Sequence, residues 1–148
     1  MPEQHDMRIA VAAASFNESI TRGLLGGALE ALDRLGISDP TVVWAPGSFE
    51  LPVVAAALAD AGHDGVVALG AVIKGETDHY EHIAAQCAAG LQQVSVQRGI
   101  PVGFGVLTVR DARHARERSA PGPGNKGAET AEAVVAAVAA LRQIRGGG

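Results

Sequence analysis

The stretch GVVALGAVI, residues 65–73, decides the fold. All nine of its residues are apolar or glycine, whereas a strand with one face in water alternates apolar and polar side chains. Such a run is typical of a parallel sheet that helices cover on both faces. We therefore expect a strand over 65–73 inside a sheet of this kind.

Similar runs flank this strand on both sides. Apolar, extended patterns at 8–14, 41–44 and 101–108 alternate with helical patterns at about 18–35, 50–62, 111–119 and 125–144, and a further helix follows residue 77 and ends near 99. Asn17 and Asn125 stand where helix N-caps are expected. The order predicts an α/β fold, a three-layer α/β/α sandwich with a four-stranded parallel sheet.

The bulk properties fit one compact unit. The chain has 148 residues, 47% of them hydrophobic, and a net charge of −4, so nothing points to disorder, nucleic acid or an anionic membrane. We expect a single domain over 1–148, with an N-terminal tail at 1–7 and a frayed end at 146–148. A lone cysteine, no apolar run of membrane-spanning length and no signal-peptide pattern at the start favour a cytoplasmic protein.

Two helices carry hints of subunit packing. The segment 83–97 has no charged residue, and its apolar residues lie on two roughly opposite sides of the helix. Burial of both sides would require a second subunit, although a plain glutamine stripe is the alternative. Gly23, Gly26 and Gly27 lie inside the first helix, where close approach of another backbone would offset their cost. Simple tolerance of these glycines is equally compatible with the sequence.

The carboxyl ends of parallel strands are where open sheets bind ligands. Four of the five aromatic residues lie in or beside the connections at that edge, and Phe104 lies within the fourth strand. The four are Phe16, Trp44, Phe49 and Tyr80. This concentration predicts a planar ligand that stacks on aromatic rings, with chance placement as the alternative.

An anion site is expected at GET, residues 75–77, because a helix N-terminus supplies free N–H groups and Thr77 adds a hydroxyl. His79 and His82 follow in the first turns of that helix. A metal site there lacks further cysteine or histidine support, so proton transfer by His79 is the preferred interpretation. The spacing matches neither a Walker loop nor a dinucleotide-binding fingerprint.

Basic residues gather after the fourth strand, at Arg110, Arg113, His114, Arg116 and Arg118. A solvated helix face is the default interpretation of this cluster. The sharper one is that a single arginine reaches a phosphate group with two hydrogen bonds. Lys126, at the start of the last helix, is a second candidate cation.

Taken together, these segments resemble the lumazine synthase family of riboflavin biosynthesis. The matching stretches, in the family's order, are Phe16-Asn17, APGSFELP (45–52), ALGAVIKGETDHYEHI (68–83), PVGFGVLT (101–108), Arg118 and GNKGAE (124–129). The resemblance implies a flavodoxin-like fold and a transferase that condenses 5-amino-6-(D-ribitylamino)uracil with 3,4-dihydroxy-2-butanone 4-phosphate. The products are 6,7-dimethyl-8-ribityllumazine, phosphate and water, in the penultimate step of the pathway.

The resemblance also implies an assembly and a set of site residues. The assembly is a homo-oligomer, a pentamer or a multiple of pentamers, with active sites shared between subunits and with no metal or organic cofactor. The pyrimidine substrate is held by Phe16, by Ser48, Phe49 and Glu50 at the ribityl chain, and by the backbone of Val72 and Ile73. Asn17 is a further substrate-binding residue. The phosphate is held by Glu76, Thr77 and Arg118, and His79 shuttles protons. The neighbouring subunit contributes Phe104, Arg118 and Lys126.

One segment departs from the family pattern. Residues 109–117 read VRDARHARE, with Arg113 and His114 at the positions of an acid and an amide in the family's usual run. A non-catalytic flavin or lumazine carrier on the same scaffold is therefore an alternative, and a purely structural shell protein is a further one.

Overall fold

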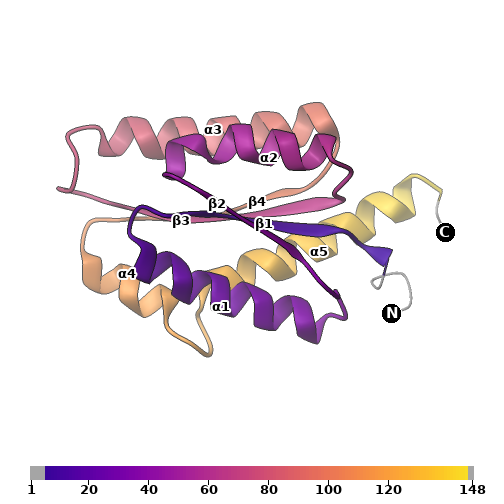
Figure 1. The fold of residues 1–148 in the computed structure, drawn as a ribbon, viewed down its shortest axis with the longest axis horizontal. Helices are drawn as coiled ribbons and strands as arrows, with labels where there is room; N and C mark the ends of the chain where they lie inside the picture. Colours follow the sequence, from indigo (N-terminus) through magenta and orange to yellow (C-terminus); the bar gives the residue numbers. More distant parts are fainter. Residues whose placement is uncertain (1–5, 147–148) are drawn as a thin grey trace.

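A computed structural model describes residues 6–146, which form four strands and five α-helices (Figure 1). The elements are β1 (Ile9–Ala14), α1 (Glu18–Arg34), β2 (Thr41–Ala45), a 3₁₀ turn η2 (Ser48–Glu50), α2 (Leu51–Asp60), β3 (Gly65–Ile73), α3 (Tyr80–Arg98), β4 (Val102–Val109), α4 (Ala112–Ser119) and α5 (Lys126–Ile144). Most of the expected tail and two residues of the expected frayed end, at 1–5 and 147–148, lie outside the described residues. Across 6–146, no helix has the length and apolarity needed to cross a membrane.

The sheet is parallel throughout, with the strand order β2-β1-β3-β4. The predicted strand at 65–73 is β3, which is buried along its whole length and pairs with both β1 and β4. Figure 1 shows α2 and α3 on one face of the sheet and α1, α4 and α5 on the other. The predicted three-layer α/β/α sandwich is confirmed, and it is of the flavodoxin-like type.

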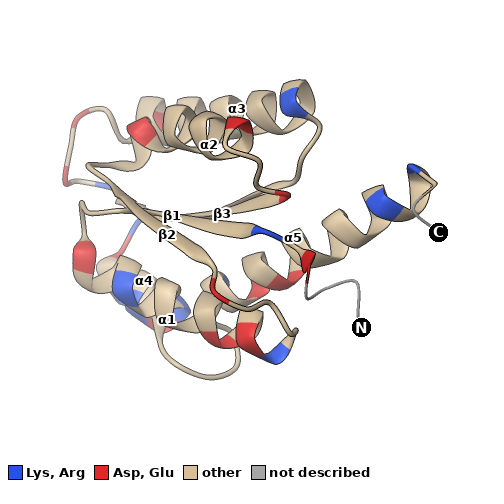
Figure 2. Cartoon of the chain, turned by 45° about the vertical axis from the view of Figure 1, so that its right-hand side comes forward, with Lys and Arg blue, Asp and Glu red and all other residues tan. Residues whose placement is uncertain are grey.

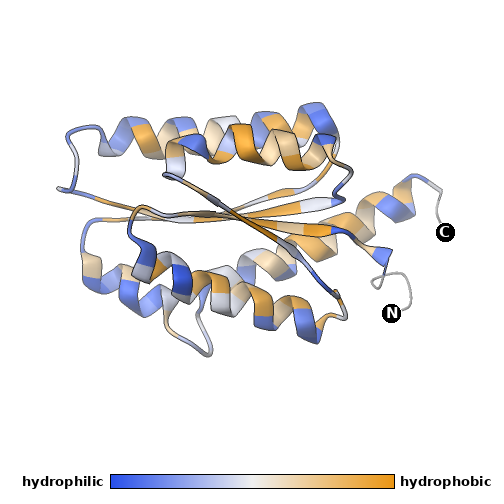
Figure 3. Ribbon diagram, viewed as in Figure 1, coloured by the Kyte–Doolittle hydropathy of each residue, from blue (hydrophilic) through white to orange (hydrophobic). Residues whose placement is uncertain are grey.

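Alternate residues of β3 belong to two separate hydrophobic cores, one on each face of the sheet, because successive side chains of a strand point to opposite faces. Val67 and Leu69 pack toward α1 and α5, whereas Val66 and Ala68 pack toward α2 and α3. In Figure 3 the apolar colour accordingly runs along the sheet between the two helical layers. Met7, within the expected tail, is buried in the core on the α1 and α5 side.

Two expectations about helix starts are wrong. Asn17 precedes α1 but makes no capping hydrogen bond with its side chain, and its backbone is left-handed, with φ 61°. The third helix begins only at Tyr80, with His79 as its N-cap residue, rather than directly after Thr77. The other asparagine does cap its helix, since the Asn125 side chain accepts a hydrogen bond from the N–H of Ala128 at 3.0 Å.

The glycines of α1 mark where other segments of the same chain approach. A Cβ on Gly23 would strike the Ser119 carbonyl oxygen, and a Cβ on Gly27 would strike the Asn125 side chain. The expected close approach of backbone is therefore confirmed at Gly23, whereas a side chain approaches Gly27, and both partners lie within the same chain rather than in a second subunit. A Cβ on Gly26 would meet nothing within 4 Å.

Gly26→Ala should raise the free energy of unfolding by about 0.5–1 kcal/mol, because alanine removes backbone freedom from the unfolded chain and meets no obstacle in α1. Urea denaturation measures the effect. Gly23→Ala is the matched control and should destabilise the protein, since its methyl group collides with backbone. A loss of stability in Gly26→Ala would mean that another surface approaches this position.

The thiol of Cys87 lies fully buried on the inner face of α3, and burial raises its pKa from 9.0 to about 11. The folded state thus favours the neutral thiol, so this contribution to stability is complete below pH 9 and is lost as the pH rises toward 11. Between those limits the free energy of unfolding should fall by about 2 kcal/mol more than in Cys87→Ala. Identical pH dependence in both proteins would contradict this.

Candidate active site

A pocket of about 470 Å³ opens where β1, β2 and β3 end. It is walled by the β1–α1, β2–α2 and β3–α3 connections, as expected for a parallel sheet. Eight residues that the sequence singled out line it: Phe16, Ser48, Phe49, Glu50, Val72, Ile73, Glu76 and Thr77. Sequence reasoning did not assign Pro46, Gly47, Ala71 or Ile83 to the site, although all four lie within the quoted stretches 45–52 and 68–83.

Backbone hydrogen bonds join the first two connections. The N–H of Ser15 donates to the Ala45 carbonyl at 2.7 Å, and the N–H of Phe16 donates to the Pro46 carbonyl at 3.0 Å. Phe16 and Phe49 consequently both line the pocket, with 56% and 58% of their surface exposed. Exposed rings of this size offer a stacking surface to a planar ligand.

The other two aromatics near this edge have different partners. The Arg22 guanidinium lies 5.1 Å from the centre of the Trp44 ring, a cation–π contact on the outside of the domain. Tyr80 packs against the core between α2, α3 and the sheet. The aromatic concentration therefore supplies two pocket residues, not four.

The pocket floor combines small and polar groups. Ser48 is buried at the start of η2, and a Cβ on Gly70 of β3 would come within 2.8 Å of its hydroxyl oxygen. Only glycine at position 70 leaves room for this hydroxyl against the strand. Glu50 lies two residues further on, so a hydroxyl and a carboxylate are both available to a polyhydroxylated ligand.

The connection 74–79, where the sequence predicts an anion site, contributes Glu76 and Thr77 to the pocket wall. Its first residue is bound to β4 by the bond from Lys74 N–H to the Val109 carbonyl, and Gly75 turns the chain with φ 95°. The Thr77 hydroxyl oxygen accepts a hydrogen bond from the backbone N–H of His79 at 3.1 Å. The hydroxyl hydrogen of Thr77 is then left to donate to a ligand, as an anion requires.

Asn17 and Glu76 are bonded to each other beside the pocket. The Asn17 side-chain amide donates to Glu76 Oε1 at 2.9 Å and to the backbone carbonyl of Ala71 at 3.0 Å. Asn17 itself does not line the pocket. It therefore contacts the site through Ala71 and Glu76.

His79 lies exposed at the N-terminus of α3, outside the residues that line the pocket. Its ring centre is 6.4 Å from that of His82, too far for both rings to share a hydrogen bond. Within 6–146, no three His, Cys, Asp or Glu side chains come together in a way that would hold a metal ion.

The remaining predicted residues form a second pocket of about 400 Å³ along β4. Phe104, Arg118 and Lys126 line it, together with Glu129, which lies in the quoted stretch GNKGAE (124–129) but was not assigned to the site. No residue is common to the two pockets. Figure 2 shows the basic residues of α4 below the sheet, and only Arg118 among them lines this pocket.

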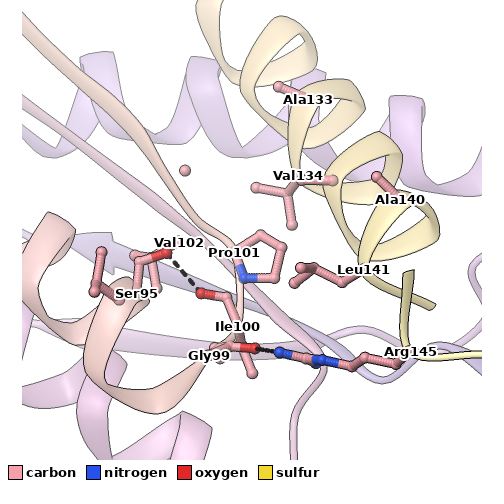
Figure 4. A pocket seen from close by; sticks show the side chains of 13 residues that line it. Ser95, Gly99, Ile100, Pro101, Val102, Ala133, Val134, Ala140, Leu141 and Arg145 are labelled. Carbon is pink, nitrogen blue, oxygen red and sulfur yellow. Dashed lines mark hydrogen bonds between the residues drawn. The ribbon is translucent and has the colours of Figure 1, made fainter. Parts of the chain in front are cut away.

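An apolar groove of about 600 Å³ continues along the first residues of β4, between α3 and α5. Figure 4 shows Val134 and Leu141 of α5 facing Pro101, while Arg145 donates to the Gly99 carbonyl at 2.9 Å. The sheet ends at β4, which pairs only with β3 among the described strands. This edge therefore combines unpaired backbone with apolar side chains.

Comparisons with known proteins agree along nearly the whole chain. Residues 6–142 match the family model of 6,7-dimethyl-8-ribityllumazine synthase. A 6,7-dimethyl-8-ribityllumazine synthase from Sodalis glossinidius (strain morsitans) is 46% identical over 144 residues, which is 95% of this chain and 92% of that protein. One of the same name from Yersinia pestis (strain Pestoides F) is 46% identical over 143 residues, 94% and 92% of the two chains.

Proposed function

The chain belongs to the 6,7-dimethyl-8-ribityllumazine synthase family, and we propose that its two separate pockets are half-sites, completed when neighbouring subunits meet. It is a transferase of riboflavin biosynthesis. It condenses 5-amino-6-(D-ribitylamino)uracil with 3,4-dihydroxy-2-butanone 4-phosphate. The observation that carries the proposal is that the expected site residues, apart from Asn17 and His79, divide between two pockets that share no residue.

The larger half-site suits the pyrimidine substrate. Phe16 supplies a ring for stacking, and the backbone of Val72 and Ile73 at the end of β3 offers polar groups to the edge of the uracil. Ser48 and Glu50, with the backbone at Phe49, provide hydrogen-bond partners for the ribityl hydroxyls. These assignments agree with the roles implied by the family resemblance.

The butanone phosphate would lie between the half-sites. Thr77 donates from one subunit, and Arg118 with Lys126 supplies positive charge from its neighbour, where Phe104 closes the apolar side. A guanidinium is suited to a phosphate because it donates two parallel hydrogen bonds. Although residues 109–117 depart from the family pattern, Arg118, which follows them, lines this pocket.

The main contribution of the protein to this reaction is to orient the two substrates. The substrate amine attacks the ketone and water leaves, phosphate is then eliminated, and the ribitylamino nitrogen closes the ring with loss of a second water. The amine is its own nucleophile, so this sequence of steps uses no metal or organic cofactor. Held orientation and charge stabilisation supply most of the acceleration, and proton transfer by His79 adds about 10²–10⁴-fold.

The assembly is proposed to be a pentamer or a multiple of pentamers. Three features of the chain support subunit contacts: the apolar groove at the free β4 edge, the divided site, and the outer face of α3, where Ala85, Ala89 and Val96 are exposed. The exposed glutamines of α3 remain compatible with a solvated stripe. We further propose that the chain acts as one domain in the cytoplasm, where its single thiol stays reduced.

Incubation of the protein with both substrates should give a fluorescent lumazine together with phosphate. Turnover that is unaffected by His79→Ala, alongside tight lumazine binding, would instead support a carrier. No product above the uncatalysed background would contradict the enzymatic function.

Arg118→Ala should raise the KM for the butanone phosphate by about 10-fold or more and leave the KM for the pyrimidine nearly unchanged, because only the former carries a phosphate. Arg116→Ala, on the same helix and outside the pocket, is the matched control. Equal losses for both substrates would show that the phosphate role of Arg118 is misassigned.

Mixing subunits tests whether the site is shared. Phe16→Ala and Arg118→Ala each damage one half-site, so a reassembled equal mixture should regain activity at about a quarter of its interfaces. The measurement is lumazine formation before and after the two variants are dissociated and reassembled together. Activity that stays at the level of the separate variants would place the whole site within one subunit.

A further inference from the structure

Glu76 is an unsuitable residue to bind a phosphate directly, although it lies at the wall where the phosphate is expected. Its carboxylate would repel a phosphate dianion at close range. Its only hydrogen-bond donor is its backbone N–H, and that group donates to the Ile73 carbonyl at 3.3 Å. The carboxylate oxygen Oε1 in turn accepts from Asn17. The backbone N–H and one carboxylate oxygen of Glu76 are thus engaged within the chain.

Asn17 is held in a conformation that needs compensation. Its φ of 61° lies in the left-handed region, which asparagine adopts more readily than most residues but still at a cost. It also forgoes the cap that its position before α1 would allow. Its side-chain amide instead donates to the backbone carbonyl of Ala71 in β3 and to the carboxylate of Glu76 in the β3–α3 connection.

The structure assigns to this pair a positioning role for the reaction: Asn17 and Glu76 form a clasp that fixes the connection 74–79 against the end of β1. The inference rests on the proposed function of the pocket. Thr77 then contacts the phosphate, whereas Glu76 acts through Asn17 and does not bind the ligand.

The connection depends on such a clasp because it has little apolar packing. Lys74, Gly75, Asp78 and His79 are exposed, and a Cβ on Gly75 would meet nothing within 4 Å. From Glu76 the constraint passes to the next residue, Thr77, whose hydroxyl accepts the N–H of His79. One bond from Asn17 thereby orders both the phosphate donor and the start of α3.

The test measures the affinity for inorganic phosphate by calorimetry and the KM for each substrate, using the assembled protein. Asn17→Gly keeps the left-handed backbone and removes the side-chain hydrogen bonds to Glu76 and Ala71, so phosphate affinity should fall about 10-fold, as should the apparent affinity for the butanone phosphate. The KM for the pyrimidine should change far less. Glu18→Gln, an exposed carboxylate one residue along the chain, is the control and should leave all three values unchanged.

Asn17→Asp gives a readout that a purely structural role would not. The new carboxylate cannot donate to Glu76, and two carboxylates so close share a proton only as the pH falls. Phosphate affinity, taken relative to Asn17→Gly at each pH, should therefore improve from pH 8 to pH 6. The other charged groups of this region, on Glu18, Glu50, Lys74, Asp78 and His79, are common to both variants and cancel in the ratio.

A double substitution reverses the clasp. In Asn17→Asp/Glu76→Gln the glutamine amide donates to the new carboxylate. Phosphate affinity at pH 8 should therefore be at least about threefold higher than in Asn17→Asp, which is the order of magnitude that one hydrogen bond contributes. Complete recovery is not expected, because the Ala71 carbonyl keeps no donor.

The proposal is overturned if Asn17→Gly binds phosphate within about twofold of the wild type, or if Glu76→Gln costs more affinity than Asn17→Gly and the double substitution gives no recovery. The second result would mean that Glu76 contacts the phosphate itself. Failure of the enzymatic function would look different: the wild type would form no lumazine, while phosphate binding would still report on the clasp.

Discussion

The side chain of Asn125 is the interaction on which one helical layer of this protein depends. The amide is almost fully buried, and it donates to the carbonyls of Gly23, Ser119 and Ala120 while it accepts from the N–H of Ala128. It therefore joins α1, the end of α4 and the start of α5 at one point. A buried amide that lost these partners would carry its full desolvation cost. The two cations of the smaller pocket, Arg118 and Lys126, lie on either side of this junction.

The sequence predicted the elements well wherever local patterns decide them. The bounds of β3 agree with the expectation because a continuous apolar run has no competing local interpretation, and Asn125 caps α5 as expected. Asn17 was misjudged because its partners Ala71 and Glu76 are 54 and 59 residues away, a distance at which no capping rule operates. The start of α3 was misplaced for a different, local reason, since the Thr77 side chain binds the N–H of His79 in a turn that the sequence pattern did not indicate.

The candidate site shows the same division between local and long-range information. Residue types and family resemblance were enough to select most residues that line the two pockets, including Phe16, Thr77 and Arg118. The resemblance implied that Phe104, Arg118 and Lys126 act from a neighbouring subunit, whereas residue types alone could not reveal that these three line a pocket of their own. That separation follows from the strand order, which places three strand ends at one pocket and β4 at the other. The partner of Glu76 was equally hidden, because it is fixed by tertiary structure alone.

The position of β4 at the free edge of the sheet has a consequence for how activity depends on protein abundance. Within one chain the two pockets share no lining residue, so folding alone does not bring them together. Under the shared site proposed above, catalysis would begin only after newly made chains have met, and the output of product would rise more steeply than the number of chains while assembly is incomplete. The rate of synthesis would then depend on the concentration of the protein itself.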